Sequence, residues 1–134
     1  MGSAGKGYRT LDVEGFEVLV GRTAKANDQL TLKVADPGDF WLHVGGGYAG
    51  SHVVVRNPQD LSELPRDVLD QAARLAAWHS KARGASGKVE VHVCRARDVS
   101  KPPRFPAGKV QLRRWDAVKV YVREPDVGKD LSKQ

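Results

Sequence analysis

The feature that most constrains the fold is one stretch of helical periodicity set among β-type segments. Apolar residues recur at three- and four-residue spacing through residues 65–83, as at Val68, Ala72 and Leu75, and Pro65 stands at the start. This pattern predicts an amphipathic helix, and its alanines predict close packing on another layer. Because a single helix cannot bury its own apolar face, the rest of the chain must supply a sheet for it to cover.

Short apolar or alternating runs supply the strands of that sheet. Residues 88–95 alternate valines with polar residues, which is typical of a strand with one face in the core. Residues 23–31 predict a loop or one helical turn, and the proline-rich residues 100–108 predict a loop. We expect strands at residues 15–21, 39–44, 53–56, 88–95 and 116–123.

About five or six strands and one principal helix do not alternate regularly along the chain. The predicted fold is therefore α+β, with a mixed, largely antiparallel sheet and one principal helix packed on it. An exposed edge strand such as residues 53–56 could pair with a second copy, so the sequence leaves the oligomeric state open.

The chain has 134 residues, which suits one domain. We expect a flexible N-terminus at residues 1–7, the domain at residues 8–123 and a polar tail at residues 124–134. The lone Cys94 cannot form an internal disulfide and suggests a reducing compartment. No apolar run approaches the roughly 20 residues of a membrane span, and no signal peptide is apparent at the N-terminus. We therefore expect a cytoplasmic protein with no membrane partner.

The net charge of +6 is distributed unevenly along the chain. Residues 1–70 carry a net charge of −3, residues 71–123 carry +10 and residues 124–134 carry −1. A segment with a charge of +10 repels itself unless the charges spread over a surface or meet a polyanion. Nucleic acid is therefore the leading class of partner, with a solvated basic face as the alternative.

Metal binding and hydrolysis find little support in the spacing of reactive residues. His43 and His52 are nine positions apart, His92 and Cys94 are two apart, and no paired-cysteine or His-Glu-x-x-His motif occurs. We expect no metal and no cofactor. Ser51 and His52 are adjacent, so on a strand their side chains would point to opposite faces. A hydrolase that uses His43, Ser51 and His52 is kept as a weak alternative to a protein without catalytic activity.

A loop at residues 45–50 contains four glycines and could approach a ligand closely. Tyr48, Phe105 and Trp115 are candidate stacking surfaces for bases, whereas Trp41 is better explained as a core residue. The polar and basic candidates for nucleic-acid contact are Arg22, Lys25, Asn27, His43, Ser51, His52, Lys81, Arg83, Lys101, Arg104 and Lys109.

Each of these candidates also has a structural explanation. Lys81 and Arg83 could cap the end of the predicted helix, where the helix dipole favours cations. Asn27, with Asp28 beside it, could cap a helix or stabilise a turn. His43 and His52 could be strand histidines bonded to the backbone. The sequence leaves these alternatives open.

Ordered motifs along most of the chain resemble one known family. They are residues 20–31 (VGRTAKANDQLT), 39–44 (DFWLHV), 50–54 (GSHVV), 80–83 (SKAR), 88–91 (KVEV), 99–102 (VSKP) and 108–110 (GKV). Together they resemble the NFACT-R domain, which follows the coiled coil in ribosome quality-control and fibronectin-binding NFACT proteins and also occurs as a free-standing bacterial protein. The resemblance covers residues 8–123. The chain departs from the family pattern at Thr23, Ala26 and Ala49.

The resemblance implies an RNA-binding role, with tRNA or ribosomal RNA as ligand, in translation, ribosome quality control or RNA modification. It does not extend to the large N-terminal domain of the full-length proteins, so their tRNA-dependent tailing activity is not expected here. A module that docks on a ribosome-associated protein through residues 101–108 is the first alternative, and the hydrolase is the second.

Overall fold

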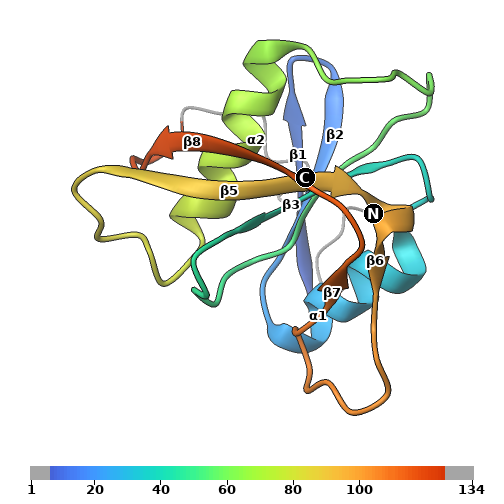
Figure 1. Ribbon diagram of the computed structural model, residues 1–134. Coiled ribbons are helices and arrows are strands. Elements are labelled where there is room, and N and C mark those ends of the chain that lie inside the picture. Colours follow the sequence, from blue (N-terminus) through green and yellow to red (C-terminus); the bar gives the residue numbers. More distant parts are fainter. Residues whose placement is uncertain (1–6, 126–134) are drawn as a thin grey trace.

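A six-stranded antiparallel sheet dominates residues 7–125, the part of the chain that the computed structural model describes. The sheet order is β1-β2-β4-β3-β5-β8, and each neighbouring pair is antiparallel. The prediction of an α+β fold is confirmed (Figure 1). The flexible N-terminus and polar tail expected from the sequence lie largely outside the described residues and stay predictions. The elements of the sheet are β1 (Tyr8–Val13), β2 (Phe16–Gly21), β3 (Phe40–Val44), β4 (Val53–Val55), β5 (Lys88–Arg95) and β8 (Asp116–Tyr121).

The remaining elements cover the two faces of the sheet. One face carries α2 (Arg66–Trp78), the principal helix. A short helix α1 (Ala24–Gln29), its π-helical continuation η1 (Leu30–Val34), the 3-10 turn η2 (Ala96–Asp98) and a hairpin of β6 (Val99–Ser100) and β7 (Gln111–Leu112) make up the rest. In Figure 1, α1 and this hairpin lie close together and away from α2. None of the helices within residues 7–125 is long and apolar enough to cross a membrane.

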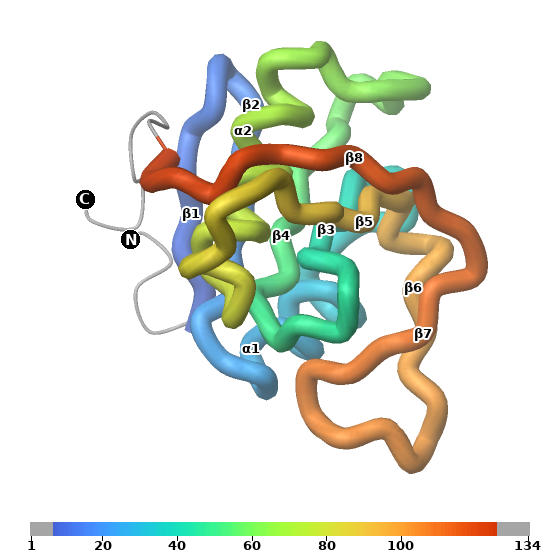
Figure 2. The backbone as a smooth tube through the Cα atoms, turned by 60° about the vertical axis from the view of Figure 1, so that its left-hand side comes forward, coloured from blue at the N-terminus to red at the C-terminus, as the bar shows by residue number. Residues whose placement is uncertain are grey.

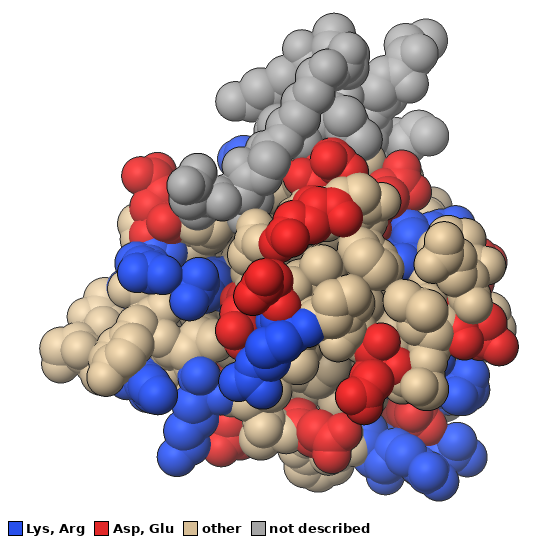
Figure 3. All heavy atoms as spheres, turned by 90° about the horizontal axis from the view of Figure 1, so that it is seen from above, with Lys and Arg blue, Asp and Glu red and all other residues tan. Residues whose placement is uncertain are grey.

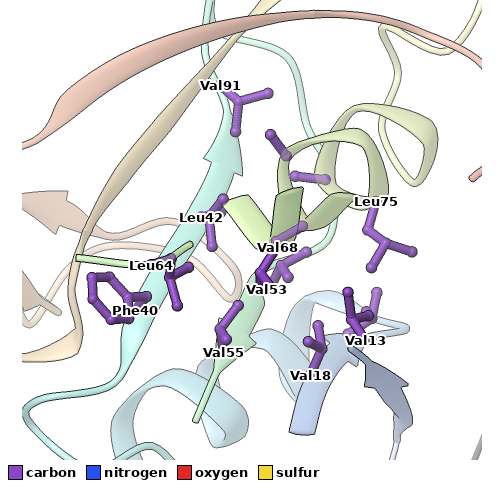
Figure 4. Packing of buried hydrophobic residues seen from close by; sticks show 14 of the residues in the cluster. Val13, Val18, Phe40, Leu42, Val53, Val55, Leu64, Val68, Leu75 and Val91 are labelled. Atoms are coloured by element: carbon purple, nitrogen blue, oxygen red, sulfur yellow. The ribbon is translucent and has the colours of Figure 1, made fainter. Parts of the chain in front are cut away.

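The main core lies between α2 and the sheet. Figure 4 shows side chains of β2, β3 and β4, among them Val18, Leu42 and Val53, pointing toward α2. The four alanines at positions 72, 73, 76 and 77 are fully buried, so the helix packs as closely as predicted. The helix ends at Trp78, however, and not at residue 83. Two residues later, Ser80 forms an antiparallel bridge with Gly50, and this pairing requires a backbone that is no longer helical.

A second core on the opposite face of the sheet contains Leu19, Leu30, Trp41, Val54 and Cys94. The prediction that Trp41 is a core residue is confirmed, since its side chain is only 1% exposed. Because both faces are covered, the three valines of β4 are all fully buried. The strand lies between β2 and β3, so the prediction that residues 53–56 form an exposed edge is wrong.

The structure differs from the local predictions at two further segments, residues 23–31 and β1. Residues 23–31, expected to be a loop or one turn, begin a helical segment that continues to Val34. Leu30 is fully buried in the second core, and this packing extends the segment beyond what its polar sequence predicts. No strand was predicted for β1, which pairs with β2 through a turn at Glu14 and Gly15 with φ of 50° and 88°. Glutamate is an unusual residue for such a turn, so the hairpin signal is weak.

Candidate nucleic-acid interface

A groove of about 990 Å³ opens beside the glycine loop. Four segments line it: the loop at residues 45–50, the turn after α2, the start of α1 and the loop between β6 and β7. Figure 2 shows the loop at residues 45–50 between the turn that follows α2 and the loop that joins β6 to β7. These segments are distant in sequence, so the groove exists only in the folded protein.

The lining of the groove has a distinctive composition. It contains all three tryptophans and all four histidines of the chain, and within residues 7–125 it contains no aspartate or glutamate. Its cations are Arg22, Lys81, Arg83 and Lys109. A cationic groove with aromatic rings and no carboxylates suits a polyanion that carries flat bases.

The basic segment at residues 71–123 contributes to the groove only in part. Arg95 donates to the carbonyl oxygens of Gly38, Leu61 and Ser62, and Arg113 pairs with Asp98 at 2.9 Å. These cationic side chains therefore stabilise loops through bonds within the protein. On the face seen in Figure 3, acidic and basic side chains are interspersed. Among the described residues, the groove therefore differs from this face in having cations without carboxylates beside them.

Asn27 is buried at the base of the groove and does not cap a helix. Its Nδ2 donates to the carbonyl oxygen of Gly50 at 3.1 Å, and its Oδ1 accepts from the backbone nitrogen of His52 at 3.0 Å. The cap of α1 is Thr23, whose Oγ1 accepts from the backbone nitrogen of Ala26 at 3.0 Å. The capping explanation for Asn27 is wrong, and the residue instead joins α1 to the segment that leads into β4.

His52 is 1% exposed and bonded at both ring nitrogens. Nε2 lies 3.1 Å from the carbonyl oxygen of Gly108, which can only accept, so Nε2 carries the proton. Nδ1 then accepts from Thr31 Oγ1 at 2.7 Å, and Thr31 Oγ1 accepts from Trp41 Nε1 at 3.0 Å. Burial lowers the pKa of His52 to about 4, so the ring is neutral at pH 7. The explanation of His52 as a backbone-bonded histidine is confirmed.

His43 lies next to this network, on β3. Its ring stacks on Trp41 with centroids 5.9 Å apart and meets the ring of His52 edge-on at 5.3 Å. Burial is the main cause of a lowered pKa of His43, and the nearby His92 lowers it further. The floor of the groove is therefore made of neutral rings near pH 7 at His43 and His52.

Ser51 lies at the groove with its hydroxyl donating to the carbonyl oxygen of Gly21. Its backbone nitrogen donates to the carbonyl oxygen of His79 at 2.9 Å. A nucleophilic serine needs its hydroxyl bonded to a base, and here the hydroxyl is bonded to a backbone carbonyl. Residues 7–125 contain no group of three or more histidines, cysteines or carboxylates that could hold a metal ion.

The predicted cations divide into three groups. Arg22, Lys81, Arg83 and Lys109 line the groove. Lys25 and Arg104 are exposed but lie outside its lining. Lys101 pairs with Asp28 at 3.1 Å and donates to the carbonyl oxygens of Lys109, at 2.8 Å, and Pro106, so it holds its own loop together.

Arg83 and Lys109 also make internal contacts while lining the groove. Arg83 Nε donates to the carbonyl oxygen of Trp78 at 2.8 Å, and its guanidinium lies 4.1 Å from the centre of the Trp78 ring. This contact confirms the helix-capping explanation for Arg83. Lys109 Nζ lies 4.8 Å from the Phe105 ring. Lys81 and Arg22 have exposed side chains at the groove.

Among the groove-lining residues that were absent from the predicted site are three aromatic ones, Trp78, His79 and His92. Trp78 and His79 were assigned to the helix, and His92 to a strand. The sequence signal that relates to His92 is Gly45, which lies beside it in the fold. A Cβ added at Gly45 would lie 2.7 Å from His92 Nε2. That close approach needs a glycine, but the sequence does not show which side chain it accommodates.

The fold and the groove define a class, a small α+β module with a groove suited to nucleic acid. The family model described as "NFACT protein RNA binding domain" matches residues 6–114. The chain therefore belongs to this family of RNA-binding domains.

Two relatives and one solved structure are similar to the chain. The chain is 36% identical over 110 residues to the Rqc2 homolog RqcH of Streptococcus suis, covering 82% of this chain and 19% of that protein. It is 40% identical over 88 residues to the Rqc2 homolog RqcH of Bacillus subtilis, covering 66% and 14%. The solved C-terminal part of the fibronectin/fibrinogen-binding protein of Streptococcus suis has a TM-score of 0.76 and 35% identity, covering 87% of this chain and 45% of that one. The chain thus spans less than a fifth of the RqcH proteins it matches.

Proposed function

We propose that this chain is a non-catalytic RNA-binding module that holds a segment of tRNA or ribosomal RNA in the groove. Its setting would be cytoplasmic, in translation, ribosome quality control or RNA modification, in keeping with its RqcH relatives. One observation carries the proposal. The groove gathers every tryptophan and histidine of the chain with four cations, and within residues 7–125 no carboxylate lines it.

The cations at the rim would bind phosphates, and their arrangement favours some predicted residues over others. Arg22, Lys81 and Lys109 are exposed at the groove, so they are the leading phosphate contacts. Lys25 and Arg104 would add peripheral contacts. Asn27, His52 and Lys101 would act indirectly, because their polar atoms already bond inside the protein. His43 and Ser51 would face the bound RNA from the floor.

The alternatives gain no specific support from these contacts. Lys101 is held by Asp28, so the loop at residues 101–108 offers a partner protein fewer free cations than its sequence suggests. The Ser51 hydroxyl donates to Gly21, which leaves the hydrolase hypothesis without a bonded nucleophile and base.

Filter binding at several salt concentrations tests the proposal with tRNA, a ribosomal RNA fragment and duplex DNA. For single strands, log affinity should fall with log salt by a slope of about −0.7 for each phosphate contact. Combining Arg22→Ala, Lys81→Ala and Lys109→Ala should therefore flatten the slope by about 2. A matched control combines Lys33→Ala, Arg97→Ala and Lys119→Ala, which removes three exposed cations outside the groove lining.

Salt-independent binding, or no RNA binding at low salt, would overturn the RNA-binding proposal. Equal losses in the groove variant and in the control variant would overturn the assignment of binding to the groove. Urea unfolding of both variants checks that each remains folded. Because all six side chains are exposed, both variants should unfold close to the wild-type midpoint.

A further inference from the structure

Two groups of aromatic rings form the floor of the groove, on β3 and β5 and at the residues that precede β4 and β8. The Trp41 ring contacts the His52 ring with centroids 5.0 Å apart, and His43 contacts both. His43 faces His92 in the register of β3 and β5. The ring of His92 in turn lies 5.3 Å from that of Trp115. The floor thus runs from a buried end at His52 to an open end at Trp115.

Two large aromatic side chains are exposed at the groove. Trp115 is 49% exposed, and Tyr48 at the glycine loop is 46% exposed. Of the four large exposed hydrophobic residues within 7–125, these two line the groove. Large apolar rings left open beside cations are typical of surfaces on which bases stack.

The Trp115 ring is also held in place before any ligand arrives. It packs on His92, whose Nε2 lies 2.8 Å from Glu90 Oε2. By contrast, the guanidinium of Arg83 lies over the Trp78 ring, and Trp41 is buried. Among the tryptophans, all of which lie in the described part of the chain, Trp115 therefore offers the most accessible ring.

A paired base in an A-form duplex presents its edge, since its faces are covered by its neighbours in the stack. Apart from the last pair at a duplex end, a ring in the groove can therefore stack only on a base that is unpaired. The lowered pKa of His43 leaves its ring neutral near pH 7, which suits a base on the floor and phosphates at the cationic rim.

From these contacts we propose that the groove selects unpaired RNA, with one base stacked on Trp115 where it packs against His92. This inference rests on the proposed function and names the form of RNA that the same groove takes. Unpaired loops or single-stranded ends would be bound, and continuous duplex would be bound only through its phosphates.

The test compares a short unstructured oligouridylate with an RNA duplex that is closed by a base-free hairpin loop at each end, so that no terminal base face is exposed. Trp115→Ala should weaken binding of the single strand about tenfold, as expected for loss of one stacked base, and should leave duplex binding unchanged. Trp115→Phe should recover part of the affinity. Tyr121→Ala removes another exposed aromatic residue, 59% exposed and outside the groove lining, and should change neither affinity.

A second measurement remains informative if the alanine variant folds poorly. The oligouridylate should quench tryptophan fluorescence in the wild type, and Trp115→Phe should abolish most of that quenching. Equal losses for single strand and duplex, or no loss for either, would overturn the stacking site while salt-dependent RNA binding still supports the proposed function. Absence of binding to both RNAs would overturn the proposed function and the stacking site together.

Discussion

The imidazole of His52 donates from Nε2 to the carbonyl oxygen of Gly108, 3.1 Å away and 56 positions later in the chain. The same ring accepts from Thr31 at its other nitrogen, and Thr31 accepts from the indole of Trp41. One buried network thus joins β3, η1, the residue before β4 and the loop between β6 and β7. The loop between β6 and β7, which forms one wall of the groove, is therefore held in place by its hydrogen bond to His52 in the floor.

Thr31→Val should destabilise the protein by about 2 kcal/mol. Valine has nearly the shape of threonine but no hydroxyl, so Trp41 Nε1 and His52 Nδ1 would both lose their partner in the core. Urea unfolding measures the change. Ser86→Ala, at an exposed loop position, is the control and should shift stability by less than about 0.5 kcal/mol. An unchanged midpoint for Thr31→Val would contradict the network.

Acidification should destabilise the protein between about pH 6.5 and 4. Burial lowers the pKa of His52 from 6.5 to about 4, so across this window the unfolded chain binds a proton that the folded chain does not. Stability is then full above about pH 6.5, falls as the pH drops and levels off for this group below about 4. The loss from His52 is on the order of 3 kcal/mol.

Burial also lowers the pKa values of His43 and His79, which act in the same direction. Urea midpoints taken from about pH 7.5 to 4.5 measure the effect. The variant His52→Gln should show a shallower decline than the wild type, because glutamine does not titrate. Parallel profiles for the two proteins would mean that folding does not lower the pKa of His52.

Gly21→Ala should be strongly destabilising, whereas Gly84→Ala should be nearly neutral. A Cβ at residue 21 would lie 2.0 Å from Asn27 Oδ1, and moving that amide would break its bonds to Gly50 and His52. We expect a loss of about 3 kcal/mol. A Cβ at residue 84 would meet nothing within 4 Å. Thermal unfolding compares the two, and similar stabilities would show that the Asn27 contacts matter little.

Lys101 and Arg104 should behave differently although they lie in the same loop. Lys101→Met removes the pair with Asp28 and the bonds to the loop carbonyls, so it should cost about 2 kcal/mol and expose the loop to proteases. Arg104 is exposed, and Arg104→Met should leave stability unchanged. Limited proteolysis with mapping of the first cut measures the difference. Equal protection in both variants would contradict the structural role of Lys101.

Much of the fold follows from local patterns. The alternation at residues 88–95 became β5, and the alanine-rich period became α2. The errors occur where packing overrides local preference. The polar segment at residues 23–31 belongs to a longer helical segment because Leu30 is buried in the second core. The bridge between Ser80 and Gly50 shortens α2, although the helical pattern continues to residue 83.

The sequence predicted which segments contribute to the candidate site. It did not predict which of their side chains are free to contact a ligand. Eight of the eleven predicted residues, all but Lys25, Lys101 and Arg104, line the groove. Whether each of them faces a ligand or the interior depends on partners that no local pattern reveals.

The sequence by itself determined the periodicities, the cationic excess of residues 71–123 and the order of motifs that marks the family. Only the tertiary structure decided which polar groups are used internally. The partners of the His52 ring lie 21 and 56 positions away, and the backbone nitrogen of Gly108 donates to Asp28 across 80 positions. Periodicity arises from neighbours along the chain, whereas hydrogen bonds and ion pairs form between atoms that folding brings together.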